Sequence, residues 1–148
     1  MTARIDINGP LAGRRALVTG ASRGIGQAIA YRLAMAGATV VVTGRTVEEG
    51  GNPLPGTIMA TVKTIIDAGG SAHALACDLT QADERQKLIE LTRALVGSVD
   101  ILVNNGAVTF YFPIKEFPDK RMRLMFEVQV MAAMELAQAF LPDMIAAG

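Results

Sequence analysis

A glycine-rich run near the start of the chain has residue types and a spacing that suit anion binding; it reads Thr19-Gly20-Ala21-Ser22-Arg23-Gly24-Ile25-Gly26. Because glycine lacks a Cβ, backbone amides in such a run can approach a phosphate closely, and the N-terminus of a following helix adds partial positive charge. The run follows the apolar segment 16–18 and opens a helical period with Ile25, Ile29, Leu33 and Ala36. This context predicts a site for a dinucleotide pyrophosphate, with a plain strand-to-helix turn as the alternative.

The elements that must position this turn are four short apolar runs, at 16–20, 39–44, 72–78 and 100–105. Continuous apolar runs of this length are typical of parallel strands buried on both faces. Helical periods separate them, with apolar residues at Ile58, Val62, Ile65 and Ile66 in one and at Leu88, Leu91 and Leu95 in the next. We expect Gly37 and Gly69-Gly70 to end helices and Thr80 to cap one. The alternation predicts an α/β fold with a parallel sheet flanked by helices.

A long helix is expected over 119–140, with Pro142 ending it. Its apolar stripe comprises Met122, Met125, Phe126, Val130, Ala133, Leu136, Ala137 and Phe140. Because methionine fills irregular gaps, its abundance here indicates core or subunit packing. The segment 48–56, which contains Pro53 and Pro55, is expected to be a surface loop and not a domain linker.

Length and composition set bounds on what the chain can be. It has 148 residues, 51% of them hydrophobic and 19% charged, with a formal net charge of zero, which predicts a single domain over 1–148. The absence of a basic excess argues against a nucleic-acid partner. Residues 1–8 lack the apolar core of a signal sequence, and no window of 18 uncharged apolar residues is found, so we expect no membrane span and a cytoplasmic protein.

Cys77 is the only cysteine, which excludes a disulfide within the chain. We expect it to be a small buried residue at the end of a strand. His73 lies four residues earlier on the same expected strand, about 13 Å away, which is too far for a catalytic pair. No set of residues in the sequence indicates a metal site.

Three motifs resemble those of the short-chain dehydrogenase/reductase family: the run at 19–26, Cys77-Asp78-Leu79 after the third strand, and Asp100 to Gly106 (DILVNNG) at the fourth. The resemblance implies a Rossmann-type sheet in the order 3-2-1-4 and a nicotinamide dinucleotide cofactor. It implies that the glycine turn binds the pyrophosphate, that Asp78 contacts the adenine and that Asn105 lies beside the adenosine ribose. The implied cofactor-binding residues are Gly20, Ser22, Arg23, Gly24, Ile25, Gly26, Arg45, Asp78, Leu79, Asn105 and Gly106. Two alternatives stay open: Asp78 could cap the next turn, and Asn104 and Asn105 could only close a strand end.

The end of the second strand favours NADP(H) over NAD(H). NAD-preferring sites place a carboxylate there for the ribose 2′-hydroxyl, whereas this chain has Thr43-Gly44-Arg45-Thr46. Arg45 and Arg23 could both face a 2′-phosphate, and one net contact of about 2.7 kcal/mol gives on the order of 100-fold discrimination. An ordinary solvated arginine is the alternative for Arg45, and NAD(H) is the alternative cofactor.

The family's catalytic Ser and Tyr-x-x-x-Lys follow a fifth strand, and the printed chain stops at Gly148, where that strand would begin. We therefore expect an inactive, truncated cofactor-binding half. Tyr111 and Lys115 match the motif in letters, but Pro113 between them disfavours the helix that would place both on one face. Gln129 stands where the family has an assisting Asn, and is the catalytic candidate. Gly106-Ala107 reverses the family's commoner order.

The sequence leaves three functions to weigh. An NADP(H)-dependent oxidoreductase acting on a carbonyl or alcohol substrate is favoured, with a noncatalytic nucleotide-binding or interaction module as the alternative. A methyltransferase that uses S-adenosylmethionine is disfavoured because Arg45 replaces the expected acid. Residues 55–58 are similar to a hydroxysteroid-dehydrogenase-like branch of the family. Because a fourth strand at the edge and an apolar helix face would both be uncovered, we expect a homo-oligomer or association through that edge.

Overall fold

The computed structural model describes residues 6–48 and 55–148. Its four strands are β1 (Arg15–Val18), β2 (Thr39–Gly44), β3 (Ser71–Ala76) and β4 (Ile101–Val103). All pairs are parallel and the order is β3-β2-β1-β4, as predicted. β2 matches its apolar run, whereas β1, β3 and β4 are shorter than theirs because Thr19, Cys77 and Asn104 already lie in the loops beyond the sheet.

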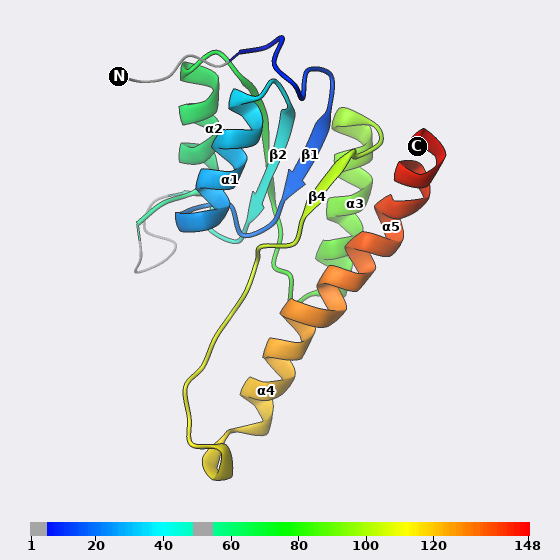
Figure 1. The fold of residues 1–148 in the computed structure, drawn as a ribbon. Coiled ribbons are helices and arrows are strands. Elements are labelled where there is room, and N and C mark those ends of the chain that lie inside the picture. The colour runs from blue at the N-terminus through cyan, green and yellow to red at the C-terminus, as the bar shows by residue number, and fades with distance from the viewer. Residues whose placement is uncertain (1–5, 49–54) are drawn as a thin grey trace.

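Three helices connect the strands: α1 (Gly24–Met35), α2 (Ile58–Asp67) and α3 (Ala82–Val96). Figure 1 shows α1 and α2 against one face of the sheet and α3 with α5 (Ala132–Ala147) against the other. Such coverage explains why β1 and β2 read as unbroken apolar runs. Gly37 and Gly69 follow α1 and α2 with φ of +98° and +92°, a conformation that glycine adopts without strain. Most of the predicted loop at 48–56 lies outside the described residues.

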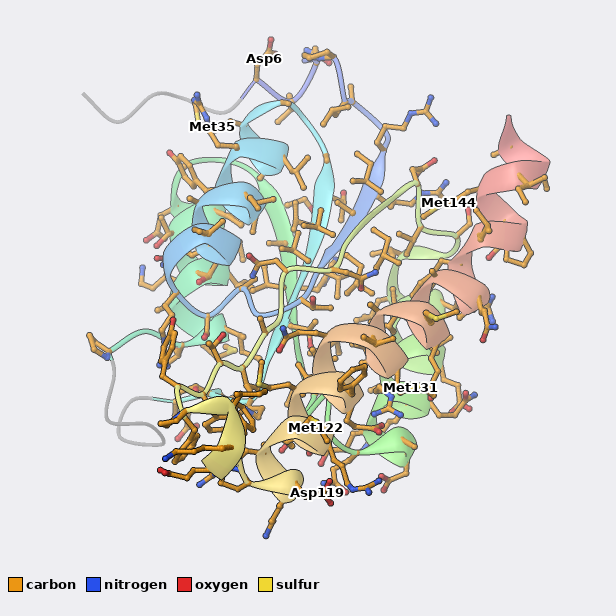
Figure 2. All side chains as sticks on the ribbon, turned by 60° about the horizontal axis from the view of Figure 1, so that its bottom comes forward. Asp6, Met35, Asp119, Met122, Met131 and Met144 are labelled. Carbon is orange, nitrogen blue, oxygen red and sulfur yellow. The ribbon has the colours of Figure 1, made fainter. Side chains whose placement is uncertain are left out.

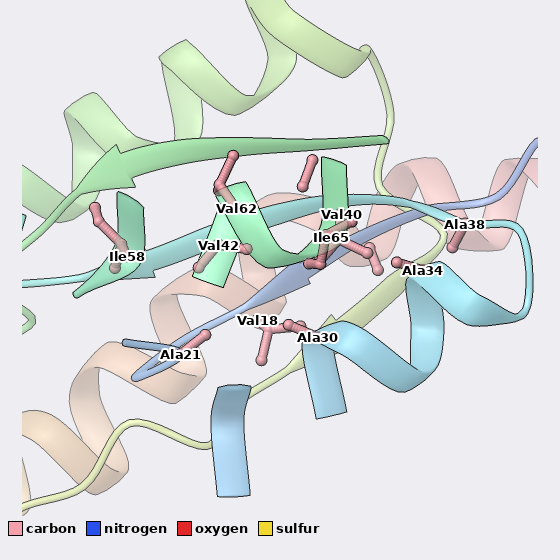
Figure 3. Close-up of a cluster of buried hydrophobic side chains, with 12 residues drawn as sticks. Val18, Ala21, Ala30, Ala34, Ala38, Val40, Val42, Ile58, Val62 and Ile65 are labelled. Atoms are coloured by element: carbon pink, nitrogen blue, oxygen red, sulfur yellow. The ribbon is translucent and has the colours of Figure 1, made fainter. Parts of the chain in front are cut away.

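Alternate side chains of the central strands enter two separate cores. On one face, Val18, Val40 and Val42 pack against Ala30 and Ala34 of α1 and against the apolar side of α2, shown in Figure 3. On the other face, the following residues form the second core: Leu17, Val41, Cys77, Leu88, Ile89, Val99, Leu136 and Phe140. The small alanines of α1 allow that helix to lie close to the sheet.

A single long helical rod runs from Asp119 to Ala147, along which Met122, Met131 and Met144 are placed in Figure 2. It consists of α4 (Asp119–Phe126), a π-helical segment η2 (Glu127–Met131) and α5. The prediction that Pro142 ends the helix is wrong, because Pro142 lies inside α5. Pro142 is on the exposed side, where the backbone carbonyl deprived of its partner can be reached by water.

The predicted apolar stripe of this rod is only partly correct. Leu136 and Phe140 are buried, but Met122, Phe126 and Val130 are 45%, 60% and 40% exposed. The wide turn at η2 shifts the helical phase, so a stripe drawn at a constant period leaves the buried face. By length and composition alone the rod is long and apolar enough to cross a membrane, but a single helix of this kind is weak evidence of a span.

Candidate functional site

A cleft with a volume of about 280 Å³ lies at the carboxyl ends of the strands. In this sheet order the chain passes from β1 to β2 and β3 on one side of β1, and then crosses from β3 to β4 on the other side. The change of direction opens a crevice at the carboxyl ends of the strands. The cleft is lined by Gly20, Ser22, Arg23, Arg45, Asp78, Leu79, Asn105 and Gly106. The fold thus brings together residues from all three sequence motifs. Gly24, Ile25 and Gly26 do not line it.

The glycines of the first turn have different structural roles. Gly20 and Gly24 have φ of +63° and +57°, the left-handed region that favours glycine. A Cβ on Gly26 would lie 2.4 Å from the Gly20 carbonyl oxygen and 2.5 Å from Asn105 Nδ2. Gly26 therefore permits close packing of α1 against the turn, and Ile25 points outward with 74% of its surface exposed.

Asn105 holds the glycine turn in place. Its Nδ2 donates to the backbone oxygens of Thr19, at 2.9 Å, and Gly20, at 3.1 Å. The amide therefore joins the end of β4 to the turn that follows β1. This contact corresponds to the role of closing a strand end. Its side chain still reaches the cleft, as does that of the neighbouring Leu79.

Thr19 is a functional residue that sequence reasoning missed. Its buried Oγ1 accepts from the backbone N–H groups of Asn105, at 3.0 Å, and Gly106, at 2.9 Å, and lies 3.3 Å from the Val103 carbonyl oxygen, to which it donates. This hydroxyl fixes the backbone after β4 against the turn after β1. The sequence signal was a single threonine at the end of an apolar run, a position where a hydroxyl in the interior needs partners.

Thr61 supplies a second support that the motifs did not indicate. Its buried Oγ1 donates to the Ala21 carbonyl oxygen at 2.9 Å, which ties the glycine turn to α2. The α2 helix is in turn positioned by Thr57, whose side chain caps it by accepting from the Ala60 N–H at 2.9 Å.

Asp78 organises the loop between β3 and α3. Its Oδ1 accepts from the Thr80 N–H at 3.0 Å, and its own N–H donates to Glu84 Oε2 at 2.6 Å. The expected helix cap at Thr80 is wrong, because the residue before α3 is Gln81, and it makes no side-chain cap. Instead, the Asp78 carboxylate stabilises the turn before the helix through its hydrogen bond to the Thr80 N–H. Asp78 also lines the cleft.

The two arginines at the cleft differ in their surroundings. Arg23 is half-buried, and its Nη2 donates to the Gly56 carbonyl oxygen at 2.9 Å and to Thr46 Oγ1 at 3.2 Å. Arg45 is exposed at the end of β2. No carboxylate lies among the residues that line the cleft at this strand end, which are Thr43, Gly44, Arg45 and Thr46.

Cys77 is buried, as predicted, and lies at the floor of the cleft. Burial raises the pKa of its thiol to about 12, and the nearby carboxylates of Glu84 and Asp78 act in the same direction. A thiol with this pKa stays protonated at neutral pH, so it is a poor nucleophile.

Gln129 lies next to the cleft and not in it. It is exposed on η2 and lines a smaller cavity of about 100 Å³, which shares Leu79, Asn105 and Val128 with the main cleft. Tyr111 is 90% exposed in the loop before the short helix η1 (Ile114–Glu116), to which Lys115 belongs. The two therefore share no helix face, as the sequence predicted. Among the described residues, no group of three or more His, Cys, Asp or Glu could hold a metal ion.

Comparison with known proteins places this geometry in a family. The short chain dehydrogenase model matches residues 14–148. The chain is 36% identical over 135 residues to hydroxysteroid dehydrogenase-like protein 2 of Bos taurus, a match that covers 90% of this chain and 32% of that protein.

Two solved structures are similar in fold and sequence. A metagenomic short-chain oxidoreductase in complex with NADP has a TM-score of 0.81 at 40% identity, covering 91% of this chain and 58% of that one. A 3-oxoacyl (acyl-carrier-protein) reductase from Agrobacterium tumefaciens C58 with NADP bound has a TM-score of 0.80 at 38% identity, covering 95% and 51%. The chain thus spans between 32% and 58% of the length of these proteins. With the family model matching nearly all of it, the chain belongs to the short-chain dehydrogenase family.

Proposed function

We propose that the chain forms the NADP(H)-binding part of an oxidoreductase that transfers a hydride between a carbonyl and an alcohol. The observation that carries the proposal is the composition of the cleft: a glycine turn at one end, and two arginines with no carboxylate at the end of β2. NADP is bound in both similar solved structures.

The residues present fit such a cofactor. Gly20 presents bare backbone to the cleft, and α1 starts at Gly24 directly after this turn, which suits a pyrophosphate. Arg45 and Arg23 are the residues that would hold a 2′-phosphate. Asp78 and Leu79 would lie on the adenine side. When bound, the nicotinamide supplies the hydride chemistry, and the protein's part is to bind and orient it.

Gln129 has a separate role in this proposal. It lies at the smaller cavity on the side of the cleft away from Arg45, beside Asn105 and Gly106. We assign its amide a structural or proton-relay role, in which it hydrogen-bonds to the groups that pass the proton, at the position where the family has Asn.

The test is the Arg45→Asp variant. We expect its affinity for NADPH to fall about 100-fold, because a 2′-phosphate would meet a carboxylate in place of a guanidinium, while NADH binding stays the same or improves. Binding is measured by the fluorescence of the reduced nicotinamide. Arg32→Asp on the exposed side of α1 makes the same charge change outside the cleft and is the control.

Equal binding of NADPH and NADH by the unmodified chain, with neither altered by Arg45→Asp, would overturn the NADP(H) assignment. An assay of hydride transfer with isotope-labelled cofactor distinguishes the oxidoreductase from the noncatalytic alternative. Stereospecific hydride transfer by a protein that contains this chain supports the oxidoreductase, and nucleotide binding with no transfer to any carbonyl supports the binding module.

A further inference from the structure

Arg85 is a charged side chain in the interior of the domain, only 2% exposed. Its Nε and Nη2 donate to Glu135 of α5 at 2.6 and 2.9 Å, a two-point contact. Its Nη1 lies 2.8 Å from Glu127 Oε1 and donates to the Leu79 carbonyl oxygen at 2.6 Å. One guanidinium thus joins α3, the helical rod and the loop after β3. The guanidinium is costly to desolvate, whereas the side chains of Glu127 and Glu135 are both 37% exposed, so these ion pairs are weak evidence of stabilisation by themselves.

The π-helical segment makes this arrangement possible. Glu127 and Glu135 are eight residues apart, and in a regular α-helix they would point about 80° apart around the axis. The wide turn of η2 begins at Glu127 and accommodates one additional residue, which brings the two carboxylates to within about 20° of each other. Both can then reach the same guanidinium.

The partners of Arg85 lead directly to the walls of the nucleotide cleft. Two apolar residues line both the main cleft and the smaller cavity: Leu79 and Val128. The carbonyl oxygen of Leu79 accepts from Arg85, and Val128 follows Glu127 in the chain. Leu79 also packs over Gly106, where a Cβ would lie 2.6 Å from Leu79 Cδ1. Val128 is 4% exposed and has no polar group of its own to fix it. The guanidinium thus contacts the backbone of Leu79 and the residue next to Val128, behind the two apolar side chains that line the cleft.

We propose that Arg85 is a positioning residue for the nucleotide cleft: with Glu127 and Glu135 it fixes Leu79 and Val128, and so sets the affinity for the nucleotide. The inference rests on the proposed function, since it assumes that a nicotinamide dinucleotide occupies the cleft. In this proposal Arg85 does not contact the nucleotide, and it acts through the side chains of Leu79 and Val128.

The experiment compares Arg85→Met with Arg93→Met. Arg93 lies two turns further along α3 and also reaches the rod, donating to the Ala139 carbonyl oxygen at 2.7 Å, but Ala139, Asp143 and Phe140, which it contacts, do not line the cleft. We expect Arg85→Met to bind NADPH about tenfold more weakly, an effect comparable to losing one charge-assisted hydrogen bond, with Arg93→Met unchanged. The ¹³C-methyl resonances of Leu79 should shift or broaden in Arg85→Met alone, with no nucleotide present.

A purely structural role would lower the urea midpoint of Arg85→Met without changing the affinity of the folded fraction, and that result would overturn the inference. Should Arg85→Met fail to fold, Glu127→Gln decides: Glu127 is 37% exposed at its side chain, so water can replace the lost contact. We expect weaker NADPH binding and shifted Leu79 methyls in this variant, and unchanged values would overturn the inference. If the unmodified chain binds no nicotinamide nucleotide, the proposed function fails as well. Normal binding by both arginine variants overturns only the role of Arg85.

Discussion

At the scale of single residues, the cleft depends on hydroxyl and amide groups that hold the backbone. Thr19 Oγ1 accepts from two N–H groups beyond β4, and Asn105 Nδ2 donates to two carbonyl oxygens of the glycine turn. The two side chains bond in opposite directions across the same gap between β1 and β4. The cleft wall at this point is therefore fixed by polar contacts as well as by packing.

Thr19→Val tests this arrangement. Loss of the hydroxyl leaves the half-buried N–H groups of Asn105 and Gly106 without their acceptor, so we expect the unfolding free energy to fall by about 2 kcal/mol. The matched control is Thr92→Val, because Thr92 is fully buried and its Oγ1 has no hydrogen-bond partner among the described residues. Urea unfolding should show Thr92→Val to be neutral or stabilising; equal losses in both variants would contradict the role given to Thr19.

At the scale of elements, Asp100 ties the start of β4 to the start of β1. Its Oδ2 accepts from the Arg15 N–H at 2.8 Å and from Arg15 Nε at 2.9 Å, and its Oδ1 accepts from Arg14 Nη1 at 3.1 Å. These contacts, those of Arg15 first, hold the pKa of the Asp100 carboxyl below its ordinary value of 3.8. The Asp100 side chain is 10% exposed while that of Arg14 is 56% exposed, so the Arg15 contacts contribute most.

We expect Asp100→Asn to lower the unfolding free energy by about 2 kcal/mol at neutral pH, the value of a charge-assisted contact in a partly buried site. Because the folded-state pKa is depressed, this contribution is complete above about pH 4 and is lost as the pH falls through the folded value. Urea titrations of both proteins from neutral pH down to about pH 2 measure the difference. A gap that persists unchanged in acid would show that charge is not its origin.

The long helix shows where prediction from sequence stopped. Its start at Asp119 and its general extent followed from the apolar period, but Pro142 proved compatible with the helix and η2 was not foreseen. A π-helical turn leaves little trace in a hydrophobic pattern, since it changes the phase by a single residue. The stabilising partner, Arg85, lies on another helix. Knowledge of the tertiary contact is needed before the local irregularity can be explained.

The rest of the fold was predictable for a physical reason. Parallel strands buried on both faces must be apolar throughout, and the helices between them must carry one apolar face, so the alternation could be read directly. The sequence motifs also indicated the cleft, because the carboxyl ends of neighbouring strands meet at one edge. The motifs could not indicate which of their residues face the cleft and which, like Gly26, allow close packing behind it. That division depends on distances between segments far apart in the chain.

At the scale of the whole molecule, one strand edge and one apolar helix face remain uncovered in the described part of the chain. β4 pairs only with β1, so its outer edge has no strand beside it. The rod carries exposed Phe126, Met131 and Met134, and a hollow of about 390 Å³ lies among Met122, Arg123, Phe126, Glu127 and Met131. Such surfaces favour association between copies.

We expect the 148-residue chain to self-associate in a concentration-dependent way, measured by sedimentation velocity. Replacing both Phe126 and Met134, which are 60% and 57% exposed, by lysine should shift the distribution toward monomer without changing the urea midpoint. Ile66→Lys on α2, where the native side chain is 53% exposed, is the control and should leave association unchanged. A monodisperse monomer for the unmodified chain at all concentrations would refute this expectation.

The strand order has a consequence for how this protein could change over evolution or be redesigned. The position of the cleft follows from the routing of the backbone between β3 and β4, which no single substitution alters. The preference for one nucleotide over another, in our proposal, depends on two positions at its rim, the half-buried Arg23 and the exposed Arg45. Selectivity can therefore drift in one or two mutational steps, whereas the location of the pocket is inherited unchanged. An engineer who wishes to exchange the redox carrier needs to alter the rim and can leave the scaffold alone.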